Sequence, residues 1–246
     1  MPPLIALWEI NEIMFDGITR AFERVMLQDD RWRFWLSGLQ LTLIVTFFAL
    51  LLGLALGLII ALIRVGYTNR TKQSPILAIL NGIAKTYVTV IRGIPMVVQL
   101  MVMNFVILAA TRNPILIASL AFGFNSAAYV SEIFRGSILS IDKGQTEAGR
   151  SLGLSQRTTM IKIVLPQALK NAIPTLGNEF ISLLKETAVA GYVAITDLTH
   201  VGNVIRGLTF DPTPLFVTAG AYLILVMGLE FLIGRVERRL RKSDLR

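Results

Sequence analysis

Polar side chains interrupt the apolar runs of this sequence in a pattern suited to binding a solute. Asn125, Tyr129 and Glu132 fall at i, i+4 and i+7, so they share one face of a helix. Carboxylates hold cationic groups, whereas hydroxyls and backbone N–H groups hold anionic ones. We therefore predict a solute site, with no catalytic residue, from six side chains: Asn125, Ser126, Tyr129, Glu132, Thr187 and Asp197.

The two carboxylates of this set also have a structural interpretation. An ionisable group inside a membrane is costly, so it either lines a pathway or is paired. Glu132 can pair with Arg135 one turn away or with Lys185. For Glu132 and for Asp197, the sequence leaves open whether the carboxylate binds substrate or forms a structural ion pair.

Composition indicates an integral membrane protein. Of the 246 residues, 54% are hydrophobic and 16% are charged, whereas a soluble domain is about 25% charged. The absence of cysteine excludes disulfides and thiolate metal sites, and we predict no metal site. In a membrane protein the positions of the basic residues matter more than the net charge of +8. We therefore expect no nucleic-acid partner.

The hydrophobic pattern predicts an all-α fold with five transmembrane helices. These spans are expected at residues 36–63, 94–110, 115–134, 172–193 and 215–233. A stripe of small residues in the first span predicts close helix packing: Ala49, Gly53, Gly57 and Ala61. Residues 75–91 are expected to form a surface or partly inserted helix, separated from the second span by a hinge at Arg92–Pro95.

The chain divides into three predicted parts. Residues 1–35 are expected to form an amphipathic interfacial segment that ends at Trp32 and Trp35. Residues 36–236 form the membrane domain, and residues 237–246 form a basic tail.

Basic residues predict the orientation. Six lie between Arg135 and Lys170 and six from Arg235 onward, with three more between Arg64 and Lys72. The opposite side has four before the first span, together with Arg112 and Arg206. The positive-inside rule therefore places the N-terminus outside and the C-terminus in the cytoplasm.

A polar segment at residues 142–166 is expected to project into the cytoplasm as a helical elbow. Asp142 and Gln145 form a capping-box pattern, and Gly153 is placed to stop the first helix. Ser155 is expected to cap a second helix, which Pro166 ends or bends. Glu147 and Arg150 either meet a partner protein or pair with each other.

This segment resembles the EAA motif of the membrane subunits of bacterial ABC importers. The matching positions are Glu147-Ala148-Gly149, Gly153 and Ile163-Val164-Leu165-Pro166, with Gly149 in place of the second alanine of the motif. The resemblance implies a type I importer core whose cytoplasmic coupling helix docks on an ATPase subunit. It implies coupling roles for Glu147, Ala148, Arg150, Gly153, Leu154, Leu165 and Pro166.

Other segments resemble permeases for polar amino acids, over most of residues 36–236. They are Arg92-Gly93-Ile94-Pro95, the run from Ala128 to Gly136, and Lys185-Glu186-Thr187. The resemblance implies a bacterial inner membrane protein that works with a second permease subunit, identical or paralogous. It also implies two ATPase subunits, an extracytoplasmic amino acid-binding protein and contact with membrane lipid.

The sequence contains no phosphate-binding loop of the G-x4-G-K-[ST] type. We therefore expect ATP and Mg²⁺ to bind the partner ATPase, and we expect this chain to need no cofactor. With one histidine and no cysteine, an intramembrane enzyme is a remote alternative, as is a passive channel. Glu132 and Asp197 favour a cationic amino acid, with a neutral or acidic one as the alternative.

Overall fold

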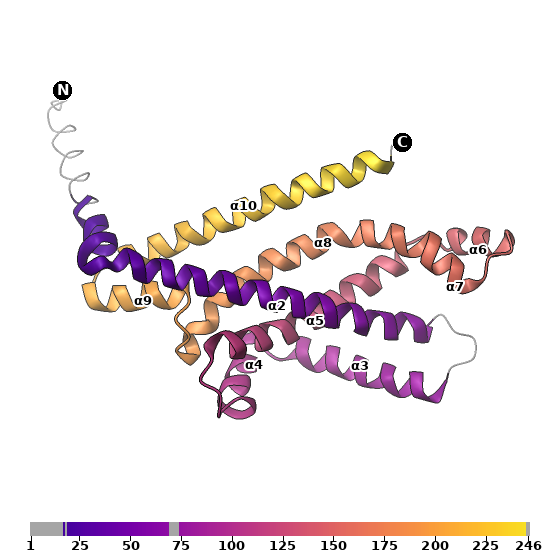
Figure 1. Cartoon of the computed structure of the whole chain (residues 1–246), viewed down its shortest axis with the longest axis horizontal. Helices are drawn as coiled ribbons and strands as arrows, with labels where there is room; N and C mark the ends of the chain where they lie inside the picture. The colour runs from indigo at the N-terminus through magenta and orange to yellow at the C-terminus, as the bar shows by residue number, and fades with distance from the viewer. Residues whose placement is uncertain (1–16, 18, 69–73, 245–246) are drawn as a thin grey trace, which may run out of the picture.

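The computed structural model describes residues 17, 19–68 and 74–244, whose regular structure is entirely helical (Figure 1). The helices are α2 (Arg31–Thr68), α3 (Pro75–Gly93), α4 (Met96–Val102), α5 (Pro114–Leu139), α6 (Lys143–Ser151), α7 (Gln156–Thr159), α8 (Leu165–Glu186), α9 (Leu198–Thr209) and α10 (Thr213–Asp244). Shorter π or 3₁₀ turns are η1 (Glu23–Leu27), η2 (Gln28–Asp30), η3 (Met103–Ile107), η4 (Met160–Val164) and η5 (Thr187–Val193). The predicted all-α fold is confirmed for the described residues.

Helices α2 and α5 pack closely through small residues. The predicted stripe on α2 is buried throughout. A Cβ at Gly53 would lie 2.9 Å from Ser126 Oγ, and one at Gly57 would lie 2.6 Å from Val130 Cγ1. Because larger side chains would separate the helices, the glycines set their distance. The predicted packing role of this stripe is confirmed.

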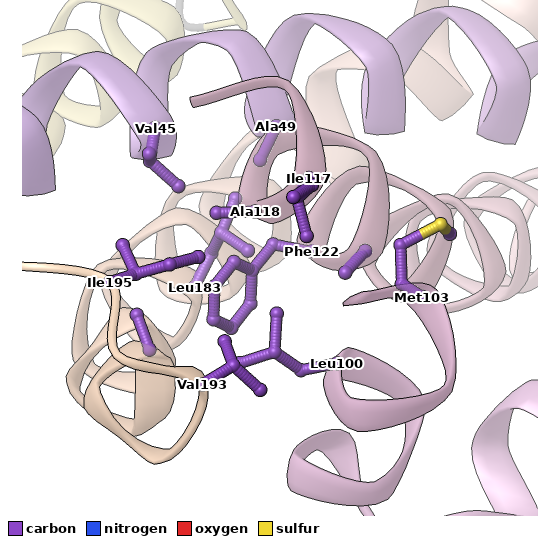
Figure 2. Packing of buried hydrophobic residues seen from close by; sticks show 12 residues of the cluster. Val45, Ala49, Leu100, Met103, Ile117, Ala118, Phe122, Leu183, Val193 and Ile195 are labelled. Carbon is purple, nitrogen blue, oxygen red and sulfur yellow. The ribbon is translucent and has the colours of Figure 1, made fainter. Parts of the chain in front are cut away.

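A hydrophobic cluster around Phe122 holds the shorter elements to this helix pair. Phe122 of α5 is fully buried. Figure 2 shows its ring beside Leu183 of α8 and Val193 of η5, with Leu100 of α4 below. The cluster therefore fixes α4, α8 and η5 around the middle of α5, where the predicted solute-binding residues begin.

Four helical stretches in the described residues are long and apolar enough to cross a membrane. They are Thr19–Thr68, Pro75–Gly93, Pro114–Leu139 and Thr213–Leu240. Met96–Ile107 is apolar but shorter, and α8 carries Glu179, Lys185 and Glu186. Pro75–Gly93 thus has the length and composition of a span, although the sequence predicted a surface or partly inserted helix. The number of five spans stays a prediction.

Several helix bounds differ from those expected. The first long helix begins at Arg31 and includes Trp35, which is buried and donates from Nε1 to the carbonyl of Val25 at 3.2 Å. Residues 1–16 and 18 of the predicted interfacial segment lie outside the described residues. The expected span at 172–193 begins earlier as α8 and continues beyond Glu186 as the 3₁₀ turn η5. The predicted hinge is confirmed, since Ile94 and Pro95 are extended between α3 and α4.

The two ends of the bundle carry different elements. In Figure 1, α6 and α7 lie at the end where α2 finishes, and the C-terminal part of α10 extends toward that end. Helix α9 lies at the other end, beside the start of α2 and the start of α10. The predicted elbow and the basic tail therefore share one end of the molecule.

Candidate functional site

The polar elbow is a capped helix followed by a turn at Gly153. Asp142 caps α6, with its Oδ1 accepting from Gly144 N at 2.6 Å. At the other end, Leu154 N donates to Gly149 O at 3.1 Å, as in a Schellman cap. Gly153 has φ +81°, a conformation that side chains other than glycine disfavour. The predicted helix, its cap and its glycine stop are confirmed.

Two details of the elbow differ from the sequence prediction. Gln145 does not complete a capping box, because its Oε1 accepts from Gln167 Nε2 of α8 at 3.3 Å. Ser155 does cap α7, accepting from Thr158 N at 3.1 Å. The chain then continues through η4 into α8, with Pro166 in the first turn of α8. Pro166 does not end the helix, because the chain stays helical from η4 into α8, and the alternative that it bends the helix stays a prediction.

Gly149 lets α6 lie directly against the following helical segment. A Cβ at this position would come within 2.7 Å of Thr159 Cγ2 and 3.1 Å of Ile163 Cδ1. Gly149 is buried, although most of α6 is exposed. The departure from the EAA pattern at this residue therefore has a local reason. It brings α6 close to α7 and η4, which links the elbow mechanically to α8.

The outward face of the elbow carries exposed side chains. Glu147, Ala148 and Arg150 are exposed, and Leu152 is 81% exposed. No ion pair joins Glu147 to Arg150 in the described part of the chain, so the alternative of mutual pairing has no support. Of the other residues predicted for coupling, Leu154 and Leu165 are half-buried and Pro166 is exposed.

Inside the bundle, Ser126 meets a carboxylate that the sequence prediction did not include. Ser126 is fully buried, and its Oγ donates to Glu179 Oε1 of α8 at 3.1 Å. The guanidinium of Arg92 lies 5.1 Å from the centre of the Tyr129 ring. Asn125 is buried beside Ser126. The structure thus brings the carboxyl group of Glu179, the guanidinium of Arg92, the ring of Tyr129 and the hydroxyl of Ser126 to neighbouring positions on α3, α5 and α8.

Glu132 is held by two arginines. Its Oε1 accepts from Arg64 Nη1 of α2, and its Oε2 accepts from Arg135 Nη2 at 2.6 Å. The two oxygens of the carboxylate are therefore both engaged within the chain. This geometry favours the structural alternative for Glu132. The predicted Arg135 pairing is present, whereas the second partner is Arg64 and not Lys185.

Thr187 and Asp197 belong to the other end of the bundle. Thr187 Oγ1 donates to Leu184 O at 2.6 Å. Asp197 is 1% exposed and caps α9, accepting from Thr199 N and His200 N at 3.0 Å each. Burial raises the pKa of Asp197, although these N–H groups oppose the rise. Asp197 thus acts as a helix cap in this structure, apart from the Ser126 cluster.

Sequence reasoning missed Glu179, the exposed Leu152 and the position of Arg92. The signal for Glu179 was present, since an acidic residue in the middle of a largely apolar helix needs a partner or a function. Leu152 carried no such signal, because only the packing of α6 shows which of its faces is left uncovered.

An all-helical membrane bundle with a polar elbow at one end has the architecture of a transporter subunit driven by another protein. The chain belongs to the family described as binding-protein-dependent transport system inner membrane component, whose model matches residues 53–242. It is a permease subunit of an ABC importer and not an enzyme. ATP is hydrolysed by a separate ATPase subunit.

Relatives and a solved structure agree with this membership. The L-cystine transport system permease protein TcyB of Bacillus subtilis (strain 168) is 34% identical over 219 residues, covering 87% of this chain and 90% of TcyB. The arginine transport system permease protein ArtQ of the same strain is 36% identical over 215 residues, covering 86% of this chain and 94% of ArtQ. A crystal structure of an amino acid ABC transporter with histidines has a TM-score of 0.75 and 35% identity, covering 84% and 94% of the two chains.

Proposed function

We propose that this chain forms the translocation pathway of an ATP-driven amino acid importer and receives its drive through the α6–α7 elbow. The observation that carries the proposal is the elbow itself. It presents Glu147 and Leu152 outward, rests on Gly149 and turns at Gly153. An exposed leucine on a rigidly capped helix is suited to docking in an apolar cleft of a partner.

The connection from the elbow to the bundle supports this role. Helix α7, η4 and α8 follow one another without a loop, so they form one helical path. A displacement of α6 by an ATPase subunit acts on α7 at the Gly149–Thr159 contact. The same path carries Glu179, whose carboxylate contacts Ser126 of α5. Movement of the elbow would therefore shift α8 against α5 at the polar cluster.

The polar cluster suits a zwitterionic substrate. The ammonium group of an amino acid can bind Glu179, and its carboxylate can bind Arg92. Glu186 is a second acidic group, which interacts electrostatically with Glu179. Glu179, whose hydrogen-bond partner is the neutral hydroxyl of Ser126, supports a cationic amino acid. ArtQ, whose name specifies arginine, is consistent with that choice. TcyB, whose name specifies cystine, supports a neutral amino acid as the second candidate.

The proposed orientation places the elbow and the basic tail in the cytoplasm, where ATP is available. Their position at the same end of the bundle supports this topology (Figure 1). The N-terminus would then lie outside, together with α9 and Asp197, on the side from which a binding protein delivers substrate. The complete transporter would contain two permease subunits and two ATPase subunits, with ATP and Mg²⁺ bound by the latter.

Substitution of Gly153 tests the coupling role. Valine is β-branched and strongly disfavours positive φ, so Gly153→Val should disturb the turn after α6 without touching the bundle. We expect the reconstituted complex to assemble and hydrolyse ATP while amino acid uptake falls to background, and Glu147→Lys to act in the same way. The control is Gly136→Val, at an exposed glycine within α5 where a Cβ meets nothing within 4 Å. Normal uptake by both elbow variants would refute the coupling role.

A further inference from the structure

Behind the elbow lies a half-open pocket that the coupling role does not explain. Its volume is about 410 Å³, within the range of small-molecule sites. It forms where the end of α2, the end of α5 and the α7–η4 segment meet. Leu62, Ile138, Met160 and Ile161 supply apolar walls. Gly66 leaves one wall without a side chain.

The floor of the pocket is part of the core, and its edges are exposed. Val65 and Ile138 belong to a buried cluster that joins α2, α5 and the start of α8. Leu62 is 50% exposed and Ile161 is 51% exposed. Leu62 lies about one and a half turns before the end of an apolar helix at Thr68. The apolar part of the pocket is therefore near the boundary of the membrane.

The charged side chain that lines the pocket is positive. Arg157 of α7 lines it, and no acidic residue does. No ion pair engages Arg157 in the described part of the chain. Among the neighbouring residues, Lys162 is exposed one turn further along, and Arg64 is already bound by Glu132. An apolar recess with an unpaired guanidinium at a membrane boundary matches an amphiphile that carries a negative head group.

We propose that this pocket binds one anionic phospholipid, with an acyl chain against Leu62 and Ile161 and the phosphate at Arg157. The lipid would bridge α2 to the α7–η4 segment and so fix the position of the elbow relative to the membrane. The proposal goes beyond coupling to the ATPase, and only the leaflet involved rests on the proposed orientation.

Two substitutions separate the head-group contact from the acyl-chain contact. Arg157→Gln removes the positive charge and retains a polar side chain. Gly66→Leu places a side chain in the pocket without a backbone clash, because a Cβ at Gly66 meets nothing within 4 Å. Lys162→Gln is the matched control for charge, because Lys162 does not line the pocket. Gly82→Leu on α3 is the control for size, since a Cβ there also meets nothing within 4 Å.

The experiment is native mass spectrometry of the permease purified with its ATPase partner and titrated with phosphatidylglycerol or phosphatidylcholine. We expect the wild-type chain and both controls to retain one phosphatidylglycerol per permease subunit in preference to phosphatidylcholine. Arg157→Gln should weaken that binding about fivefold, and Gly66→Leu should abolish it. Unaltered unfolding temperatures would establish that the variants are folded.

Three results would overturn the proposal. They are equal retention of the two lipids by the wild-type chain, unchanged phosphatidylglycerol binding by Arg157→Gln and Gly66→Leu, and crosslinking of Ile161→Cys to a protein subunit in place of lipid. The last would show that a partner fills the pocket. Because this measurement uses neither ATP nor amino acid, its failure leaves the coupling proposal standing, and the failure of coupling leaves lipid binding standing.

Discussion

Two glutamates in the bundle have opposite environments, which decides their expected roles. Glu132 has an arginine on each oxygen, from α2 and from its own helix. Glu179 has a neutral serine as its hydrogen-bond partner. A carboxylate already neutralised by two guanidinium groups has little capacity left for a substrate cation, whereas a carboxyl group bonded to a neutral hydroxyl has an oxygen free for one. Glu179 is therefore the stronger candidate for substrate recognition.

Glu132→Gln should act on stability. The change removes the negative charge that Arg64 and Arg135 share in a half-buried site, so we expect the complex to lose about 2 kcal/mol of stability. Thermal unfolding in detergent measures this loss, and equilibrium binding of the amino acid to the folded variant should remain near the wild-type value. Weaker binding at an unchanged unfolding temperature would instead assign Glu132 to the substrate site.

Glu179→Gln should act on binding. Loss of the charge facing the substrate ammonium group should weaken amino acid binding by roughly tenfold or more, with the larger loss for arginine than for glutamine if the substrate is cationic. Scintillation proximity assays on the purified complex give both affinities. Glu230→Gln, at an exposed position on α10, is the control. Equal affinities for wild type and Glu179→Gln would exclude this carboxylate from the site.

At the scale of elements, buried caps connect the outer helices to the core. Asp197 caps α9, and Thr42 Oγ1 of α2 accepts from the next backbone N–H, that of Leu198, at 3.1 Å. Tyr222 of α10 donates to Asp197 Oδ2 at 3.4 Å. Three helices therefore meet at the N-terminus of α9, where Asp197 bonds α10 as well as capping α9.

Substitution of Asp197 should reveal this junction through its pH dependence. Because burial raises its folded-state pKa above the ordinary 3.8, its contribution to stability is complete below that value and is lost as pH rises through the raised pKa. Asp197→Asn keeps the cap and cannot titrate, so its unfolding temperature should fall less than that of wild type over this pH window. Asp197→Ala removes the cap, so it should cost about 1 to 2 kcal/mol at low pH, where the wild-type contribution is complete. Parallel pH profiles for wild type and Asp197→Asn would contradict this account.

At the scale of the whole molecule, the sequence predicted local features of the fold better than contacts between residues far apart in the chain. The stripe of small residues, the Asp142 cap and the turn at Gly153 follow from spacing and residue type, and the structure contains all three. The pairing of Glu132 with Arg64 joins residues 68 positions apart, and no periodicity indicates such a contact. Polarity and helical spacing indicate candidate solute-binding residues, but they cannot separate the cap at Asp197 from the cluster at Ser126.

The central claim is that the elbow meets the ATPase subunit, and a cysteine crosslink measures that contact directly. The chain has no native cysteine, so Leu152→Cys introduces a single thiol at a position of the elbow that is 81% exposed. Leu208→Cys is the control, because Leu208 is also exposed, at 66%, but lies on α9 at the other end of the bundle. With a short bifunctional reagent, we predict crosslinking of the ATPase subunit to Leu152→Cys and none to Leu208→Cys. Crosslinking to Leu208→Cys with none to Leu152→Cys would contradict the account.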